Sequence, residues 1–235
     1  MRRVVILGTG TDVGKTYVAA GLARALRERD PSAAVLALKP IESGVAPDTG
    51  GALVRRRPPP GTDARQLADV STSPLPAPNP LYALPEPLSP HLAARRAGLA
   101  ISLERVAAWI GSAEASMPPR ARAAYLIVET AGGVLTPLTP TATNLDLAAA
   151  IPDAAWLLVA PDSLGVLHDV AATHLALRAL GHRPDYVIVT QCRPADRSTS
   201  TNAAELRRLH PATPVLALPR SSTDALHTLA DELTR

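Results

Sequence analysis

The sequence is poor in cysteine and in aromatic residues: among 235 residues it has one cysteine, no phenylalanine, two tryptophans and four tyrosines. The single cysteine, Cys192, excludes an internal disulfide and any metal cluster built from cysteines, which is typical of a reducing compartment. So few aromatic side chains give no platform for stacked bases. The net charge of +3 comes from scattered arginines, not from a basic stripe. We therefore expect no nucleic-acid partner.

Long apolar runs are missing as well. No stretch approaches the roughly 20 residues that a helix needs to span a bilayer. The two arginines near the start are followed only by the apolar run Val4–Leu7, shorter than the core of about 7–15 residues found in a signal peptide. We expect a cytoplasmic protein without a membrane interaction. With 46% hydrophobic and 19% charged residues, the composition is that of a globular chain long enough for one sizeable domain.

Strand and helix patterns alternate over most of the chain. The β-branched run Val4–Leu7, ended by Gly8, predicts a buried strand; residues 14–30 predict a helix, and residues 33–40 a second strand that ends at Lys39. Further strands are predicted over 125–129, 154–161, 185–191 and 214–219, and further helices over 89–98, 102–115, 143–151, 165–181, 201–210 and 222–235. We predict a single doubly wound α/β domain over residues 1–235, with a mostly parallel sheet flanked by helices.

Two proline-rich segments interrupt this alternation, at about residues 45–62 and 71–90. Proline lacks a backbone donor and breaks helices, so the second segment can form neither a regular helix nor a central strand. We predict surface loops for both. A long loop beside a nucleotide site often serves as a substrate lid.

The loop after the first predicted strand is "GTGTDVGKT", residues 8–16. A dinucleotide-binding loop has the pattern G-x-G-x-x-G, but Val13 stands in place of the third glycine, and Lys39 in place of the acidic residue expected after the second strand. The loop therefore fits the dinucleotide-binding pattern poorly.

A nucleoside triphosphate loop, G-x-x-x-x-G-K-[ST], fits better. Gly14, Lys15 and Thr16 supply backbone N–H groups at a helix start, an ammonium for phosphates and a hydroxyl for Mg²⁺. The first glycine, Gly8, comes one residue earlier than this pattern requires. Placed between a strand and a helix, the loop predicts a phosphate site.

Polar residues follow other predicted strands, and the carboxyl ends of parallel strands are where ligands bind in such sheets. Lys39 closes the second strand and is followed four residues later by Ser43. Glu129 closes the third strand, and Asp63 precedes a helix. Thr16, Asp63 and Glu129 together offer the oxygen ligands that Mg²⁺ takes alongside phosphate and water. Lys39 could instead be a solvated lysine at a strand edge, and Asp63 an ordinary helix cap.

Several motifs in order along the chain resemble those of the dethiobiotin synthetase family. They are "GTGTDVGKT", "LKPIESG", "GTDA", "LSPHLAA", "VETAGG", the helix "LGVLHDVAATHLAL" and a strand that ends in "VTQ". Together they cover nearly the full length, and the family shares the longer glycine spacing of the phosphate loop. The resemblance implies a P-loop NTPase-like fold and a homodimer whose active site is shared between subunits.

The implied reaction uses ATP and Mg²⁺ to make dethiobiotin in biotin biosynthesis. One amine of 7,8-diaminononanoate takes up CO₂ as a carbamate, ATP phosphorylates the carbamate, and the second amine closes a cyclic urea. Phosphoryl transfer of this kind needs positioning and charge neutralisation more than a side-chain nucleophile. The lack of an evident Cys–His or Ser–His arrangement agrees with this mechanism.

The resemblance also implies roles for individual residues. Catalytic roles fall to Lys39, Lys15, Ser43 and Thr11. The nucleotide would contact Gly8, Asp12, Val13, Gly14, Lys15, Thr16, Tyr17, Asp63, Glu129, Gln191, Cys192, Pro219, Arg220 and Ser221, with Gln191 reading the base. Mg²⁺ would bind Thr16, Asp63 and Glu129. The substrate would contact Lys39 and Ser43, and Gly165, Val166 and His168 would contact the substrate of the neighbouring subunit.

Four positions differ from the family pattern: Asp12, where glutamate or glycine is frequent; Thr130, which replaces the first glycine of "EGAGG"; Gln191, where asparagine is usual; and His168, also in place of asparagine. Thr130 adds a Cβ to a turn that favours positive φ, which puts the turn geometry in question. Gln191 bears on the preference for ATP, and His168 on the substrate end.

Rival functions remain. A carboxylate-amidating synthetase of the cobalamin-pathway type would need a glutaminase domain with a nucleophilic cysteine, for which 235 residues and Cys192 alone do not suffice. A partitioning or metal-carrier ATPase, acting as a nucleotide switch, would carry an extra lysine early in the phosphate loop or a cysteine pair, and neither is present. A diverged synthetase homologue with another diamine-like substrate stays open.

Overall fold

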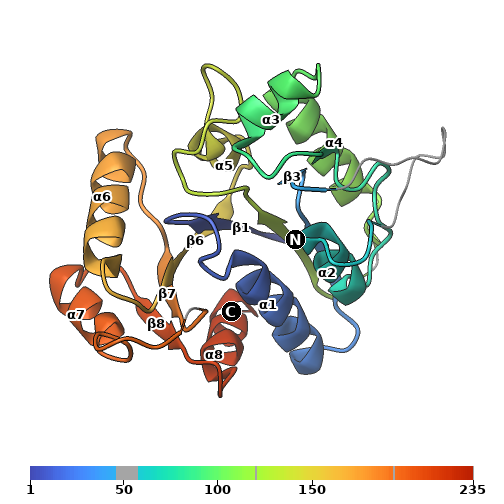
Figure 1. The fold of residues 1–235 in the computed structure, drawn as a ribbon. Coiled ribbons are helices and arrows are strands. Elements are labelled where there is room, and N and C mark those ends of the chain that lie inside the picture. Colours follow the sequence, from blue (N-terminus) through green and yellow to red (C-terminus); the bar gives the residue numbers. More distant parts are fainter. Residues whose placement is uncertain (46–57, 120, 193, 235) are drawn as a thin grey trace.

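A six-stranded sheet forms the centre of the computed structural model, which describes residues 1–45, 58–119, 121–192 and 194–234 (Figure 1). The strand order is β2-β5-β1-β6-β7-β8, and every neighbouring pair is parallel. The strands are β1 (Arg2–Gly8), β2 (Ala34–Leu38), β5 (Ala124–Glu129), β6 (Ala154–Pro161), β7 (Tyr186–Thr190) and β8 (Val215–Leu218). The predicted mostly parallel sheet is confirmed.

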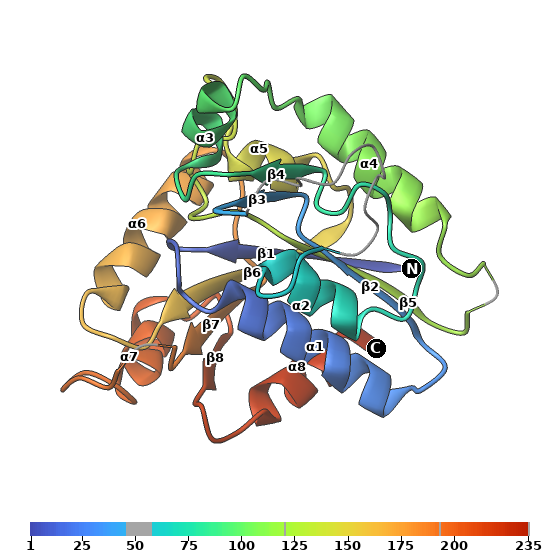
Figure 2. The ribbon, with the colours of Figure 1, turned by 45° about the vertical axis from the view of Figure 1, so that its right-hand side comes forward.

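Helices cover both faces of this sheet, because every crossover between parallel strands must pass over one face (Figure 2). The helices are α1 (Lys15–Arg29), α2 (Asp63–Val70), α3 (Pro90–Arg96), α4 (Leu103–Ala115), α5 (Asn144–Ala149), α6 (Val166–Ala179), α7 (Asn202–Leu209) and α8 (Asp224–Thr234). In the described part of the chain, no helix is both long and apolar enough to cross a membrane.

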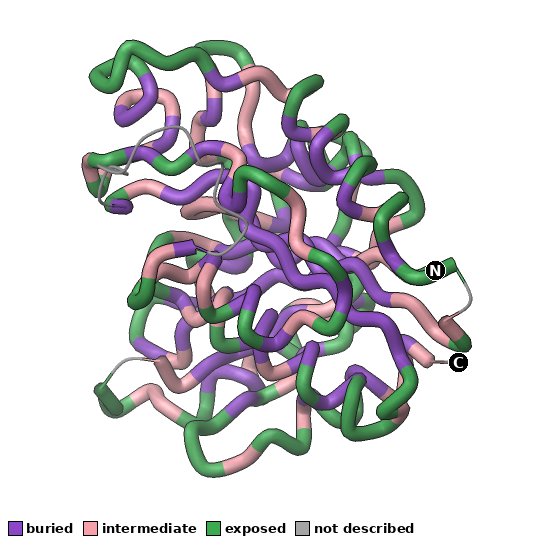
Figure 3. The backbone as a smooth tube through the Cα atoms, turned by 90° about the vertical axis from the view of Figure 1, so that its right-hand side faces the viewer, coloured by how far each residue is buried: buried purple, intermediate pink, exposed green. Residues whose placement is uncertain are grey.

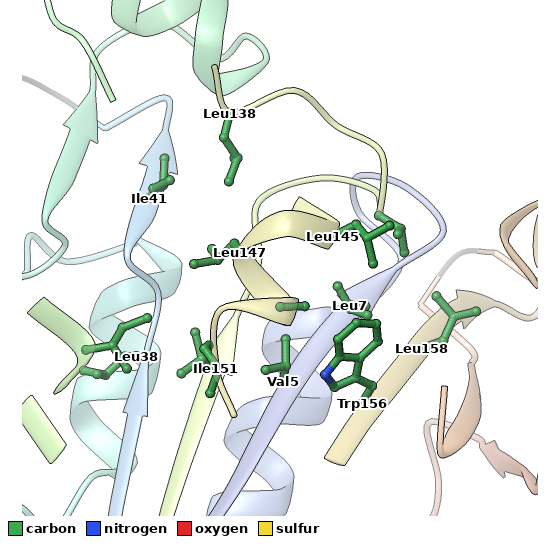
Figure 4. Close-up of a cluster of buried hydrophobic side chains, with 14 of the residues drawn as sticks. Val5, Leu7, Leu38, Ile41, Leu138, Leu145, Leu147, Ile151, Trp156 and Leu158 are labelled. Atoms are coloured by element: carbon green, nitrogen blue, oxygen red, sulfur yellow. The ribbon is translucent and has the colours of Figure 1, made fainter. Parts of the chain in front are cut away.

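Alternate residues of β1 serve two separate hydrophobic cores. Val4 and Ile6 pack in the core that contains α1, α2 and α8, whereas Val5 and Leu7 pack in the core on the opposite face, with side chains of α3 to α7. Figure 4 shows Val5 and Leu7 in that second core, and in Figure 3 the buried strands run through the middle of the molecule. This two-sided burial explains why the strand sequences are apolar runs without polar alternation.

A second, two-stranded sheet lies outside the central one. It pairs β3 (Ile41–Ser43) with β4 (Tyr82–Leu84) in parallel. β4 falls within the proline-rich segment 71–90, so the prediction of a loop throughout that segment was wrong for these three residues. Flanking prolines are tolerated here because the strand is short and at an edge. Most of the other proline-rich segment, residues 46–57, lies outside the described residues.

Candidate active site

The candidate site lies at the carboxyl ends of β1, β2 and β5, where two cavities of about 650 and 240 Å³ adjoin. Five residues line both cavities: Thr11, Asp12, Lys39, Asp63 and Gly132. The other residues that line the smaller cavity belong to the phosphate loop and α1, together with Glu129 and Cys192. The other residues that line the larger cavity belong to β3, to the segment that leads into α3 and to the turn after β5. A triphosphate and a second substrate could therefore meet at their border.

The loop between β1 and α1 is held by a neighbouring strand and by its own lysine. Thr190, the last residue of β7, donates its hydroxyl to the carbonyl of Val13 at 2.6 Å. A Cβ on Gly8 would lie 2.9 Å from Cδ of Lys15, so glycine leaves room for the lysine side chain to fold back over the end of β1. The early glycine of the motif is thus explained by the close approach of Lys15.

Lys15 presents a buried ammonium to this loop. Its Nζ donates to the carbonyl of Gly10 at 2.7 Å, and the residue is only 5% exposed. Burial lowers the pKa of Lys15 to about 8, since the opposing attraction of Glu129 is weaker and nearby Lys39 adds repulsion. A buried cation with a carbonyl as its hydrogen-bond partner gains from an approaching anion, which fits a phosphate-binding role.

Lys39 lies at the centre of a buried charge network. Its Nζ donates to Oε1 of Glu129 at 2.8 Å and forms an ion pair with Asp63. Thr16 donates its hydroxyl to the same Oε1 at 2.9 Å. Burial disfavours the charged form of Lys39, but Glu129 and Asp63 outweigh burial and raise its pKa. With the residue 7% exposed, the alternative of a solvated lysine is wrong.

Two buried oxygens at the site have no hydrogen-bond partner among the described residues: Oε2 of Glu129 and Oγ of Ser43. An unpaired carboxylate oxygen beside Thr16 and Asp63 fits a hard cation such as Mg²⁺, which prefers oxygen ligands. The described residues include no group of three or more His, Cys, Asp or Glu side chains that could hold a metal by themselves. A cation here would therefore need phosphate oxygens or waters as further ligands.

Asp63 is the first residue of α2, and the residue before it forms the helix cap. Thr62 accepts a hydrogen bond from the backbone of Arg65 at 3.2 Å, so the alternative of Asp63 as the cap is wrong. Glu42, which was not predicted from the sequence as a site residue, accepts with its carboxylate from the backbone N–H groups of Asp63 and Ala64. Burial raises the pKa of Glu42. A carboxylate within the "LKPIESG" motif was the signal that could have identified it.

The turn after β5 accommodates Thr130 without strain. Its hydroxyl donates to the carbonyl of Ile6 at 3.0 Å, and the positive φ of the turn falls at Gly132, at 81°. The concern about Thr130 was therefore wrong. A second residue missed from the sequence, Asn144, donates from Nδ2 to the carbonyls of Ala131 and Gly133 at 2.6 and 2.8 Å and so holds the turn.

The nucleotide contacts predicted after β7 and β8 come together beside the phosphate loop. Arg220 donates to the carbonyls of Gln191 and Cys192 at 2.8 and 3.0 Å, and the thiol of Cys192 lies 3.3 Å from the carbonyl of Asp12. Pro219 and Ser221 flank Arg220 in the turn after β8. Tyr17, at 44% exposure, lines the smaller cavity.

The residues predicted for the neighbouring subunit lie apart from these cavities. Gly165 precedes α6, and Val166 and His168 lie in its first turn, but none of the three lines either cavity. Figure 1 shows α6 on the opposite side of the molecule from α2. Their proposed contact with a second subunit remains a prediction.

Residues 2–223 match a family model described as an AAA domain. The chain is 37% identical to an ATP-dependent dethiobiotin synthetase BioD of Anaeromyxobacter dehalogenans (strain 2CP-1 / ATCC BAA-258), over 93% of this chain and 90% of that protein. It is 36% identical to the protein of the same name from Caulobacter sp. (strain K31), over 99% and 94%. A ParA family ATPase from Chlorobium tepidum TLS is similar in structure, with a TM-score of 0.51, 17% identity and coverage of 98% and 92%, which shows a shared fold alone.

Proposed function

This chain belongs to the family of ATP-dependent dethiobiotin synthetases, and from that premise we propose that it closes the cyclic urea of dethiobiotin at the site described above. The observation that supports this most is the position of Lys39. It lines both cavities and pairs with Glu129 and Asp63, next to the loop that carries Lys15. A cation at this border can act on a phosphate and on a second substrate together.

The reaction balances as follows. One amine of 7,8-diaminononanoate attacks CO₂ and loses a proton, which gives a carbamate. A carbamate oxygen takes the γ-phosphoryl group of ATP, and ADP leaves. The second amine then attacks the carbamate carbon, the phosphate leaves with the bonding electrons, and a proton is released. Both bond-forming nucleophiles belong to the substrate, so the protein needs to bind, orient and neutralise charge.

Each side chain at the border has a role that its surroundings support. Lys15, at the helix start, would neutralise the phosphates, and Lys39 would stabilise the carbamate and the charge that develops on it. Ser43, whose buried hydroxyl oxygen has no partner among the described residues, would hydrogen-bond the carbamate or an amine. Thr11, which lines both cavities, would contact the transferring group.

Thr16, Asp63 and Glu129 are the residues that would hold Mg²⁺. The ion supplies charge neutralisation to the phosphates. Gln191, Cys192 and the turn Pro219–Ser221 would border the base, because they lie together beside Asp12 of the phosphate loop.

We also propose a homodimer that acts in the cytoplasm. Leu164, two residues before α6, is 85% exposed, and Leu175 within α6 is 70% exposed. A patch of exposed apolar side chains is typical of a surface that another chain covers, and we propose that these two leucines belong to one. Backbone N–H groups near Gly165 and Val166 would then reach the substrate carboxylate of the other subunit.

The experiment that tests the proposed function is product identification. The protein is incubated with ATP, Mg²⁺, ¹³C-bicarbonate and 7,8-diaminononanoate, and the products are analysed by mass spectrometry. The expected product is dethiobiotin that carries one ¹³C atom, in an amount equal to the ADP formed. ATP consumption that yields ADP and phosphate with no labelled cyclic urea would contradict the proposal and favour a nucleotide switch.

A further inference from the structure

Glu42 is a buried carboxylate that none of the proposed catalytic steps uses. It lies on β3, lines the larger cavity and is only 6% exposed. Its Oε1 accepts from the backbone N–H of Asp63 at 2.6 Å and its Oε2 from that of Ala64 at 3.0 Å. Both oxygens are therefore committed to the first turn of α2.

These two bonds complete the N-terminus of α2. The first N–H groups of a helix have no partner within the helix, and a local cap satisfies only some of them. Here Thr62 accepts from Arg65, and Glu42, twenty-one residues earlier in the chain, accepts from Asp63 and Ala64. A negative charge at a helix start also interacts favourably with the helix dipole.

Of the two side chains that cap α2, Glu42 is the one that bonds to Asp63, whose carboxylate we propose as a ligand of Mg²⁺. The backbone of Asp63 is held by Glu42, and its side chain pairs with Lys39, which in turn pairs with Glu129. The backbone of Glu42 is itself fixed, because β3 pairs with β4 in a register that places Glu42 beside Ala83. A paired strand thus holds, through Glu42, the start of the helix that presents Asp63.

We propose that Glu42 is a positioning residue for the reaction, whose carboxylate holds the first turn of α2 so that Asp63 faces Lys39 and Glu129. This inference rests on the proposed function, since it takes Asp63 as a ligand of Mg²⁺. Glu42 touches no reacting atom in this role. It acts through the position of Asp63.

The test compares two ways of weakening the same helix end. Glu42→Gln keeps the size of the side chain, but its amide NH₂ would face a backbone N–H, so one of the two bonds is lost. Thr62→Ala is the matched control: it removes the local cap of α2 and leaves Glu42 and its bonds to Asp63 in place. Both variants are compared with the wild-type full chain for thermal unfolding, for Mg²⁺ affinity with a non-hydrolysable ATP analogue bound, and for kcat and KM.

We expect Glu42→Gln to weaken Mg²⁺ binding roughly tenfold, as the loss of one hydrogen bond to a charged group would, and to lower kcat by a similar factor. Binding of the ATP analogue without Mg²⁺ should stay unchanged. Hydrogen exchange at the amides of Asp63 and Ala64 should become faster. Thr62→Ala should lower the melting temperature with a change of about twofold or less in Mg²⁺ affinity.

Two results would overturn the inference: wild-type Mg²⁺ affinity and kcat in Glu42→Gln, or an equal loss of Mg²⁺ affinity in Thr62→Ala. If Glu42→Gln does not fold, Glu42→Asp takes its place, since it keeps the charge and shortens the reach, and a loss in the same direction is expected. A wild-type protein that binds Mg²⁺ and the analogue but forms no dethiobiotin would contradict the proposed function alone. The Mg²⁺ comparison would still decide the role of Glu42.

Discussion

Lys39 and Thr16 donate hydrogen bonds to one and the same oxygen, Oε1 of Glu129, at 2.8 and 2.9 Å. Glu129 is 1% exposed, and its other oxygen has no partner among the described residues. A buried carboxylate and ammonium each lose several kcal/mol of hydration on burial, so such a pair contributes little to stability unless its geometry is very good. We interpret this arrangement as one retained for chemistry at the border of the two cavities.

Substitutions of the two lysines of the site should have different effects on catalysis and on nucleotide binding. Lys39→Ala should lower kcat by about a thousandfold, since it removes the preorganised charge that we propose acts on the carbamate, while the affinity for an ATP analogue changes little. Lys15→Ala should weaken analogue binding as well, because Lys15 belongs to the phosphate loop. Steady-state kinetics and calorimetric titration of the analogue check this. Near-normal turnover in Lys39→Ala would show that the carbamate role is wrong.

The pKa of Lys15 predicts how ATP binding depends on pH. Burial lowers this pKa to about 8 in the folded protein, against 10.5 for a free lysine. Between these values the unfolded chain binds more protons than the folded one, so the destabilising effect of burying Lys15 is present below pH 8 and relieved as the pH rises. In the free protein, Lys15 loses its charge above pH 8. ATP-analogue affinity should therefore fall above pH 8, and binding there should take up protons.

Titration calorimetry in buffers of different ionisation enthalpy measures that proton uptake. Lys15→Arg is the control, because arginine stays charged over this range. The interpretation fails if both proteins take up the same number of protons at pH 9.

A substitution of Gly133, in the turn after β5, should displace the neighbouring phosphate loop. A Cβ on Gly133 would lie 3.1 Å from the carbonyl oxygen of Thr9 and 3.5 Å from Cα of Gly10. Gly133→Ala should therefore push the loop and weaken ATP-analogue binding by roughly tenfold, with kcat lowered too. Gly111→Ala in α4 is the control, since nothing lies within 4 Å of its added Cβ. It should leave binding unchanged and raise stability by about 0.5–1 kcal/mol.

A shared active site can be tested by mixing two inactive variants. Lys39→Ala removes the cation of one site, and Gly165→Asp places a negative charge where we propose that the substrate carboxylate of the other subunit binds. Random pairing would give half heterodimers with one intact site each, and thus about a quarter of the wild-type activity. The mixture should be assayed after subunit exchange. A mixture no more active than its components would argue against the shared site.

Most of the fold and the centre of the site could be predicted from the sequence, for a physical reason. Apolar runs such as Val4–Leu7 and 125–128 signal parallel strands, and the carboxyl ends of such strands lie at one edge of the sheet. Lys39 and Glu129, ninety residues apart, therefore come together where the sequence analysis expected a ligand. The turn after β5 was harder, since the accommodation of Thr130 depends on a carbonyl of β1.

Other features had no local signal. β4 has three residues between prolines, too few for a strand period to stand out. The role of Glu42 depends on the N-terminus of α2, which the chain reaches only after the segment 46–57, and no spacing rule links the two. Asn144 likewise acts through carbonyls of a distant turn. Contacts of single side chains with remote backbone groups are visible only once the fold is known.

The most direct test of the proposed reaction is to measure phosphate release from ATP with Mg²⁺ and bicarbonate, with and without 7,8-diaminononanoate. Because phosphate leaves only when the second amine attacks the carbonyl carbon, we predict fast release with the diamine, one phosphate per dethiobiotin, and little release without it. Equal release in both reactions, or tight ATP binding with no release in either, would contradict the account.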